Sequence, residues 1–204
     1  MITKKTMKMS EALLNSDYWE KRYKDERTGW DIGYVSSPLK EYIDQLTNKD
    51  IKVLIPGAGN SYEAQYLFEQ GFHQVYVLDI ARAPLESLQN RVPGFPENQL
   101  LHKDFFQHSE QYDLILEQTF FCALLPKLRD QYVQKTYNLL KKGGKLAGVL
   151  FDFPLTKEGP PFGGDQVEYH NRFQKYYAVK TLERCYNSIA PRKGNELFFI
   201  FEKK

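Results

Sequence analysis

One stretch of the sequence, residues 51–80, limits the possible folds more than any other. Two short apolar runs flank a Gly-rich turn and a segment with helical periodicity. The turn contains Gly57 and Gly59, and glycine allows a backbone to approach a ligand closely. The second run ends in Asp79, 22 positions after Gly57. These features predict a strand–turn–helix–strand unit that binds an adenosine-bearing cofactor, with Asp79 accepting hydrogen bonds from the ribose hydroxyls.

The turn argues against a dinucleotide. A G-x-G-x-x-G turn needs a third glycine for tight packing around a pyrophosphate, and this chain has Tyr62 at that position. A cofactor without phosphates therefore fits the turn better. The alternative is an ordinary parallel α/β unit whose tight turn binds no ligand.

The rest of the chain continues the alternation of helices and strands. Helices are predicted at Pro38–Leu46, Ser61–Gln70, Pro84–Arg91, Arg129–Lys141 and Gln166–Phe173. Further strands are predicted at Leu100–Lys103, Tyr112–Glu117, Lys145–Phe151, Tyr177–Cys185 and Glu196–Phe201. The last two strands have no room for a crossover helix between them, so they must be antiparallel. We therefore predict an α/β fold with a doubly wound, seven-stranded sheet that is mostly parallel and has a terminal antiparallel strand pair.

Residues 10–37 predict an N-terminal aromatic arm. Asp17 is expected to cap a short helix on which Trp19 and Tyr23, four positions apart, share one face. Trp30 follows between turn residues. The arm is either a hydrophobic segment packed on the core or a lid over a cofactor. A cationic cofactor would favour the lid, because aromatic faces attract cations.

Candidate binding residues follow the predicted strands. Ligands of a doubly wound sheet bind beyond the carboxyl ends of the strands. Asp79, Asp104 and Gln118 are placed there, with aromatic residues beside them. Asp104 suits the exocyclic amine of adenine, with Phe105 against the ring; the alternative is that Asp104 caps the next turn. Gln118 and the following aromatics are predicted to lie near the reacting end of the ligand.

The composition limits the class of protein further. The 204 residues predict a single domain, and a formal charge of +2 gives no reason to expect nucleic acid as a partner. No apolar stretch suggests a membrane span or a signal peptide, and nothing indicates an obligate protein partner. Cys122 and Cys185 are expected to be reduced and structural, so we expect a cytoplasmic protein. The four histidines lack metal-ligand spacing, and no metal is expected.

Several segments together resemble one family, the thiopurine methyltransferase superfamily of S-adenosylmethionine-dependent methyltransferases, and most closely its halide/thiol methyltransferase branch. The resemblance spans most of the chain. It is most specific in the Trp30-Asp31-x-Gly33 arm and the Gly159-Pro160-Pro161-Phe162 loop. The other matching segments are Tyr18–Tyr23, Val53–Gly59, Tyr112–Ile115, Phe120–Ala123, Leu140–Gly144 and Pro191–Gly194.

The resemblance implies a Rossmann-like class I methyltransferase that uses S-adenosylmethionine and releases S-adenosylhomocysteine. Its acceptor would be a small thiol, thiopurine or halide-like molecule, methylated by in-line displacement without a strong general base. Phe121 and Arg129 are implied on the substrate side, and no catalytic residue is assigned. Gln118 departs from the family, in which some members have Tyr, and Tyr23 stands where many have Trp. The candidate cofactor-binding residues are Trp19, Tyr23, Trp30, Gly57, Gly59, Asp79, Ile80, Asp104, Phe105 and Gln118.

Three other functions stay open at this point. A methyltransferase could act on another small acceptor, such as a selenium or tellurium species or an amine. A nicotinamide-dependent oxidoreductase would use a similar sheet, although Tyr62 and the antiparallel strand pair argue against it. A regulator could bind the cofactor without catalysis.

Overall fold

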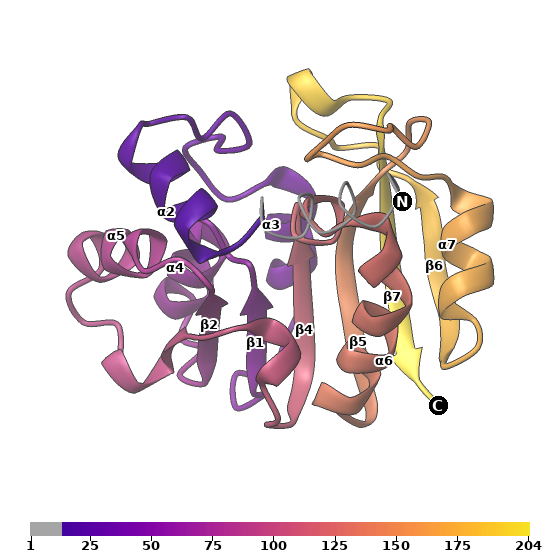
Figure 1. The fold of residues 1–204 in the computed structure, drawn as a ribbon. Helices are drawn as coiled ribbons and strands as arrows, with labels where there is room; N and C mark the ends of the chain where they lie inside the picture. Colours follow the sequence, from indigo (N-terminus) through magenta and orange to yellow (C-terminus); the bar gives the residue numbers. More distant parts are fainter. Residues whose placement is uncertain (1–13) are drawn as a thin grey trace.

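The structure is a computed structural model that describes residues 14–204. Seven strands form one sheet with the order β3-β2-β1-β4-β5-β7-β6 (Figure 1). Strands β1 to β5 are parallel, and β7 runs antiparallel to both β5 and β6, which confirms the predicted sheet. The strands are β1 (Val53–Pro56), β2 (Val75–Asp79), β3 (Leu100–His102), β4 (Tyr112–Gln118), β5 (Leu140–Phe151), β6 (Tyr177–Arg184) and β7 (Glu196–Lys203).

Helices cover both faces of the sheet. Helices α3, α4 and α5 pack on one face, and α6 and α7 pack on the other (Figure 1). The helices are α2 (Ser16–Lys24), α3 (Ser37–Asp44), α4 (Tyr62–Glu69), α5 (Ala83–Arg91), α6 (Arg129–Leu139) and α7 (Gln166–Phe173). Short 3₁₀ turns include η2 (Phe105–Gln107), η3 (Phe121–Ala123) and η4 (Pro126–Leu128).

Strand β1 shows why the core has two layers. Val53 and Ile55 pack with helices α3 to α5, whereas Leu54 packs with the aromatic layer around α6 and α7. All three side chains are buried. Because successive side chains of a strand point to opposite faces, an unbroken apolar run is what a strand covered on both faces requires.

The parallel strands all end at the same edge of the sheet. The aromatic arm, the loop that follows β5 and the loop that joins β6 to β7 lie along this edge, at the top of Figure 1. These three segments are far apart in the sequence. The fold therefore brings the arm, the Gly-Pro-Pro-Phe loop and the Pro191–Gly194 segment to the ends of β1, β2 and β4.

Two local predictions are wrong. Asn15, not Asp17, caps helix α2, because its side chain accepts a hydrogen bond from the Tyr18 amide at 2.9 Å. Strand β5 begins at Leu140, five residues before the predicted Lys145. The reason is a bulge. Residue 112 pairs with Leu140 and residue 114 pairs with Lys145, so the intervening Lys-Lys-Gly-Gly residues loop out, with Gly143 at φ 73°. Residues 10–13 of the predicted arm lie outside the described part of the chain.

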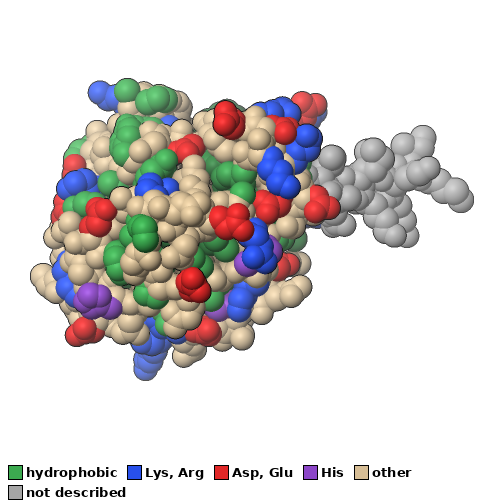
Figure 2. Space-filling view, turned by 90° about the vertical axis from the view of Figure 1, so that its left-hand side faces the viewer, with side chains coloured by type: hydrophobic (Ala, Val, Ile, Leu, Met, Phe, Trp, Pro, Cys, Tyr) green, Lys and Arg blue, Asp and Glu red, His purple; other side chains and the backbone are tan. Residues whose placement is uncertain are grey.

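The surface matches the near-neutral net charge. Figure 2 shows basic and acidic side chains interspersed over one face of the molecule. Among residues 14–204, no helix is both long enough and apolar enough to span a bilayer. Within the same residues, no cluster of three or more His, Cys, Asp or Glu side chains is arranged to hold a metal ion.

Candidate functional site

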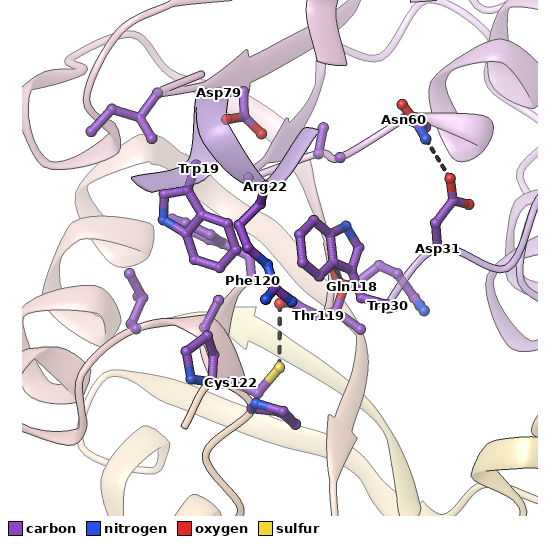
Figure 3. Close-up of a pocket in the computed structure, with 18 of the residues that line it drawn as sticks. Trp19, Arg22, Trp30, Asp31, Asn60, Asp79, Gln118, Thr119, Phe120 and Cys122 are labelled. Atoms are coloured by element: carbon purple, nitrogen blue, oxygen red, sulfur yellow. Dashed lines mark hydrogen bonds between the residues drawn. The ribbon is translucent and has the colours of Figure 1, made fainter. Parts of the chain in front are cut away.

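A cavity of about 590 Å³ lies at the carboxyl edge of the sheet (Figure 3). It is lined by the arm, by the turns after β1, β2 and β4, by η2 and by the loops after β5 and β6. The structure brings all ten predicted cofactor residues to this one cavity, and their contacts with a cofactor stay predictions. They are Trp19, Tyr23, Trp30, Gly57, Gly59, Asp79, Ile80, Asp104, Phe105 and Gln118.

The turn after β1 has a backbone that favours glycine. Gly57 and Gly59 both adopt left-handed conformations, with φ of 55° and 53°. A β-carbon on Gly57 would lie 2.0 Å from Cδ2 of Phe120, so that ring takes the space a side chain would need. The turn leads directly into helix α4, whose first backbone N–H groups have no intrahelical partners. The first residues of α4, Tyr62 and Glu63, line the cavity beside the turn.

Asp79 ends β2 at the rim of the cavity. Its side chain is 7 % exposed, and one carboxylate oxygen accepts a hydrogen bond from the Ala81 amide at 2.8 Å. Burial raises the pKa of Asp79 to about 6, and hydrogen bonds from the amides of Ala81, Gly59 and Ile80 limit this rise. The carboxyl group is thus held rigidly in place and is ionised at neutral pH.

The arm contributes an aromatic cluster to the cavity (Figure 3). The Trp30 ring packs edge-on against Trp19 and Tyr23, with centroid distances of 5.5 and 5.7 Å. The guanidinium of Arg22 lies 5.4 Å from the centre of the Trp30 ring. Burial, and then the nearby Asp79, raises the pKa of Tyr23, so its hydroxyl stays neutral. The cluster gives the cavity a wall with several aromatic faces.

Polar contacts fix the arm to the sheet edge. Glu20 accepts hydrogen bonds from the Arg82 and Ala83 amides at 3.1 and 3.2 Å, and it thereby caps helix α5. The side chain of Asp31 accepts a hydrogen bond from that of Asn60 in the Gly-rich turn (Figure 3). The arm thus packs on the domain edge and lines the cavity at the same time. Both readings of the arm agree with this placement, and the lid stays a prediction.

Asp104 has both of the properties expected of it. Its side chain caps η2 by accepting a hydrogen bond from the Phe106 amide at 2.8 Å, as in the alternative reading. It also lines the cavity, next to the buried ring of Phe105. The cap orients the carboxylate, since one of its oxygens is fixed by the backbone.

The amide of Gln118 belongs to a buried polar group that sequence reasoning missed. Its Oε1 accepts a hydrogen bond from Ser36 Oγ at 3.1 Å, and the Ser36 amide donates to Glu63 Oε1 at 3.0 Å. Glu63 is buried in the first turn of α4, and burial raises its pKa. No sequence pattern indicated Ser36 or Glu63, because their meeting depends on helix α3 packing beside α4.

Two predicted substrate-side residues, Phe121 and Arg129, do not line the cavity. The Phe121 ring is buried between Tyr132 and Tyr169 in the aromatic core. Arg129 is fully buried in α6, where its Nη1 pairs with Glu168 at 2.8 Å and its Nη2 donates to the Gly163 carbonyl at 2.6 Å. Arg129 therefore binds the loop after β5 to helices α6 and α7 and does not face a ligand.

In the described part of the chain, the cations that do line the cavity are Arg22 and Arg192, and Arg192 lies in the loop between β6 and β7. Its Nη2 donates to the Trp30 carbonyl at 2.7 Å, and its side chain is 10 % exposed. Its Nη1 is buried without a hydrogen-bond partner and lies 3.6 Å from Glu196 Oε1. Arg192 belongs to the Pro191–Gly194 segment, but nothing in the sequence indicated that this segment reaches the cavity.

A family model described as thiopurine S-methyltransferase matches residues 14–203. The chain belongs to the thiopurine S-methyltransferase family. This confirms the family and the class of enzyme, a methyltransferase, that the sequence predicted.

Curated members of the family cover most of the chain. A probable thiol methyltransferase 2 of Arabidopsis thaliana is 29 % identical over 89 % of this chain and 83 % of its own length. Thiocyanate methyltransferase 1 of Brassica oleracea is 29 % identical over 87 % of this chain and 81 % of its own length. Thiopurine S-methyltransferase of Acinetobacter baylyi is 23 % identical over 89 % of this chain and 94 % of its own length.

A solved structure shares the fold. The 1,6-didemethyltoxoflavin-N1-methyltransferase of Burkholderia thailandensis, solved with S-adenosylhomocysteine, superposes with a TM-score of 0.77. It is 19 % identical, and the match covers 96 % of this chain and 89 % of that chain.

The cavity of this thiopurine S-methyltransferase family member suits S-adenosylmethionine. Its volume of about 590 Å³ is within the usual range for pockets that hold small molecules. The left-handed glycines keep the turn free of side chains, and the Asp79 carboxylate lies beside that turn. The aromatic wall of Trp19, Tyr23 and Trp30 suits a positively charged sulfonium. The residues that line the cavity thus fit S-adenosylmethionine, the cofactor of the family.

Proposed function

We propose that this protein transfers the methyl group of S-adenosylmethionine to a small thiol-type acceptor, which reacts as a thiolate or as a comparable soft anion. The observation that supports this most is the lining of one cavity, which falls by chemistry into two sets of residues, which we call its two parts. One part has the Gly-rich turn, Asp79 and the aromatic arm with Arg22. The other part is mainly apolar and has the guanidinium of Arg192, which pairs with Glu196.

The first part would hold the cofactor. Asp79 binds the ribose hydroxyls, and Asp104 with Phe105 binds the adenine. Gly57 and Gly59 let the backbone pass close to the ligand. The chain forms a single domain, and its arm, with Trp19, Tyr23 and Trp30, is a lid that closes over the sulfonium end of the cofactor. When bound, S-adenosylmethionine supplies an electrophilic methyl group on a sulfonium sulfur.

The second part would hold the acceptor. Apolar side chains line it, among them Leu124, Leu125, Leu128, Phe151, Pro160 and Pro161. An anion that enters loses water, and it would share the positive charge of Arg192 with Glu196, whose Oε1 lies 3.6 Å from Arg192 Nη1. Removal of water makes a small anion a better nucleophile, and the walls hold it in line with the methyl group. A thiolate or halide needs no strong general base for this step.

The thiol of Cys122 lines the same cavity without competing for the methyl group. Burial raises the pKa of Cys122, and its Sγ donates a hydrogen bond to the Thr119 carbonyl at 3.3 Å (Figure 3). The reactive form of cysteine is the thiolate. A buried thiol that stays protonated is therefore inert beside a reactive donor.

The names of the relatives support a sulfur acceptor. Thiol, thiocyanate and thiopurine methyltransferases share sulfur nucleophiles that are anionic or easily ionised. The apolar half with one cation suits the small anions of this group best, with halides as the nearest alternative. The acceptor is therefore a small molecule. The free, buried Cys122 and Cys185 support the expected cytoplasmic location.

An acceptor panel tests the proposal. Purified protein is incubated with S-adenosylmethionine and one of five acceptor types: bisulfide, thiocyanate, iodide, a neutral thiol or a thiopurine. The formation of methylated product and S-adenosylhomocysteine is measured. We expect the highest kcat/KM for a small sulfur anion. The same assay is run with an amine and with selenium and tellurium oxyanions, and turnover of any of these with none of any sulfur acceptor or halide would contradict the proposal.

A further inference from the structure

Glu117 is a fully buried carboxyl group near the end of β4, bonded to the turn whose residues line the cavity. Its Oε1 accepts hydrogen bonds from the Phe120 and Phe121 amides, both at 2.8 Å. Its Oε2 accepts a hydrogen bond from the Tyr132 hydroxyl at 2.5 Å. These three partners are neutral. A buried carboxyl group held in this way costs free energy, which calls for a reason beyond packing.

The turn held by Glu117 is strained. Thr119 adopts a left-handed backbone with φ of 59°, which is unusual for a β-branched residue. Its hydroxyl donates to the Gln118 carbonyl at 2.7 Å, and Cys122 Sγ donates to the Thr119 carbonyl. Such strain persists only where the surroundings hold it, and it is concentrated at functional sites. The two amides that Glu117 binds come directly after Thr119, so Glu117 is the group that closes this turn.

The turn forms the wall between cofactor and acceptor. Gln118, Thr119, Phe120 and Cys122 all line the cavity. The Phe120 ring lies where a β-carbon on Gly57 would be, so its place is tied to the cofactor turn. A shift of the Phe120 amide would move this ring and the Cys122 side chain together.

The surroundings of Glu117 fit this role. A β-carbon on Gly148 would lie 2.1 Å from the Glu117 carbonyl oxygen and 2.8 Å from its β-carbon, so glycine at 148 lets β5 approach the backbone of β4 closely at Glu117. On the other side, the Tyr132 ring stacks on Phe105 with a centroid distance of 5.6 Å. Tyr132 thus joins Glu117 to an aromatic residue of the cofactor part.

We propose that Glu117 is a positioning residue for methyl transfer, which holds the Thr119–Cys122 wall at the distance from the Gly57 turn that the in-line reaction needs. This inference rests on the proposed function. It predicts that removal of the two acceptor contacts lowers kcat without removing the cofactor site, because an error of about 1 Å in placement can cost on the order of a hundredfold in rate.

The test compares three variants. Glu117→Met keeps the length of the side chain and removes both acceptors; we expect kcat to fall by about fiftyfold or more, with the Kd for S-adenosylhomocysteine within about threefold of the wild type. Glu117→Gln keeps an oxygen acceptor for the two amides, and we expect it to retain most of the activity. Tyr132→Phe removes one contact to Glu117 and should lower kcat by a few-fold.

Tyr177→Phe is the matched control. Its hydroxyl also bonds to α6, at Thr136 Oγ1 with a distance of 2.9 Å, but Tyr177 does not line the cavity. If folded Glu117→Met keeps kcat within twofold of the wild type, the inference is wrong. If Glu117→Met does not fold, the double variant Glu117→Gln/Tyr132→Phe takes its place, and a kcat equal to that of Tyr177→Phe would overturn the inference. Absence of S-adenosylhomocysteine binding by the wild type would instead refute the proposed function.

Discussion

The ring of Phe120 occupies the space that a side chain on Gly57 would need, with Cδ2 only 2.0 Å from the position of a β-carbon. The Gly-rich turn after β1 and the turn after β4 are therefore in direct contact. Gly57→Ala should raise the Kd for S-adenosylhomocysteine by more than about tenfold, because the alanine must displace the ring and also adopt a left-handed backbone that costs about 1–2 kcal/mol. Calorimetry measures this change.

Gly71→Ala separates the two causes. Gly71 has φ of 85° and nothing within 4 Å of its β-carbon position, so this variant carries the backbone strain without the clash. It should lower the free energy of unfolding and leave the Kd unchanged. An equal loss of affinity in both variants would show that the contact with Phe120 does not matter for binding.

The second prediction concerns Asp79. Asp79→Ala should weaken S-adenosylhomocysteine binding by more than about tenfold, since hydrogen bonds to a charged group are worth about 1.5–3 kcal/mol. The pKa of Asp79 is about 6 in the folded protein, and only the ionised form accepts hydrogen bonds with both oxygens. Wild-type affinity should thus fall as the pH decreases through 6, whereas Asp79→Asn should bind with little pH dependence. A parallel pH profile for the two proteins would count against Asp79 as the ribose ligand.

The third prediction concerns Arg192. Arg192→Met should raise KM for thiocyanate or bisulfide by about tenfold or more, because the anion loses a charged donor in an apolar site. The KM for a neutral thiol should change much less. Arg192→Lys should recover part of the affinity for anions. Initial rates with one anionic and one neutral acceptor check this, and an equal effect on both would indicate that Arg192 acts only by holding the Trp30 carbonyl.

Substitution of Arg129 should lower stability and leave the preference for anionic acceptors unchanged, in contrast to substitution of Arg192. Arg129→Met breaks the pair with Glu168 and leaves the Gly163 carbonyl without its donor. Because Glu168 is partly exposed, we expect the free energy of unfolding to fall by about 2–3 kcal/mol. This corresponds to a Tm that is lower by roughly 4–12 °C. The ratio of KM values for anionic and neutral acceptors should stay that of the wild type. A selective loss of anionic acceptors would restore the substrate-side role that the sequence predicted.

The buried carboxyl group of Glu117 predicts how the stability of the protein depends on pH. Burial raises its pKa from the ordinary 4.5 to about 7, so the folded protein keeps a proton that the unfolded chain releases between these values. The stability that this proton contributes is complete below pH 4.5 and is lost as the pH rises through 7. Gln does not titrate. The Tm of Glu117→Gln relative to the wild type should therefore increase from pH 5 to pH 8, and a constant difference would contradict the buried, titrating carboxyl group.

The sequence predicted that the candidate cofactor residues meet at one edge of the sheet, because the signals for this placement are local. Gly57, Gly59 and Asp79 lie within one strand–turn–helix–strand unit, and strand ends of a parallel sheet meet at one edge. The same argument from strand ends predicted that Asp104 and Gln118 lie at this edge. The seven strands and the antiparallel pair were also predicted, since the absence of a crossover helix between the last two strands decides their direction.

The acceptor part was harder to predict because it depends on contacts between distant segments. Arg192 meets the arm through the Trp30 carbonyl, 162 positions away in the sequence. After β4, the sequence could not tell which of Phe120 and Phe121 faces the cavity, because the chain leaves the strand through a left-handed residue and a 3₁₀ turn. Arg129 follows this turn and enters the core with α6, where Glu168 and the loop after β5 neutralise it.

The most direct test of the account is calorimetric titration of the wild-type protein with S-adenosylhomocysteine at pH 7.5, with NADH as the comparison. We predict saturable binding of S-adenosylhomocysteine at one site per chain, weakened by more than about tenfold in Gly57→Ala and Asp79→Ala, and no comparable binding of NADH. No binding of S-adenosylhomocysteine, or preferential binding of NADH, would contradict the assignment of the cavity to a methyl donor.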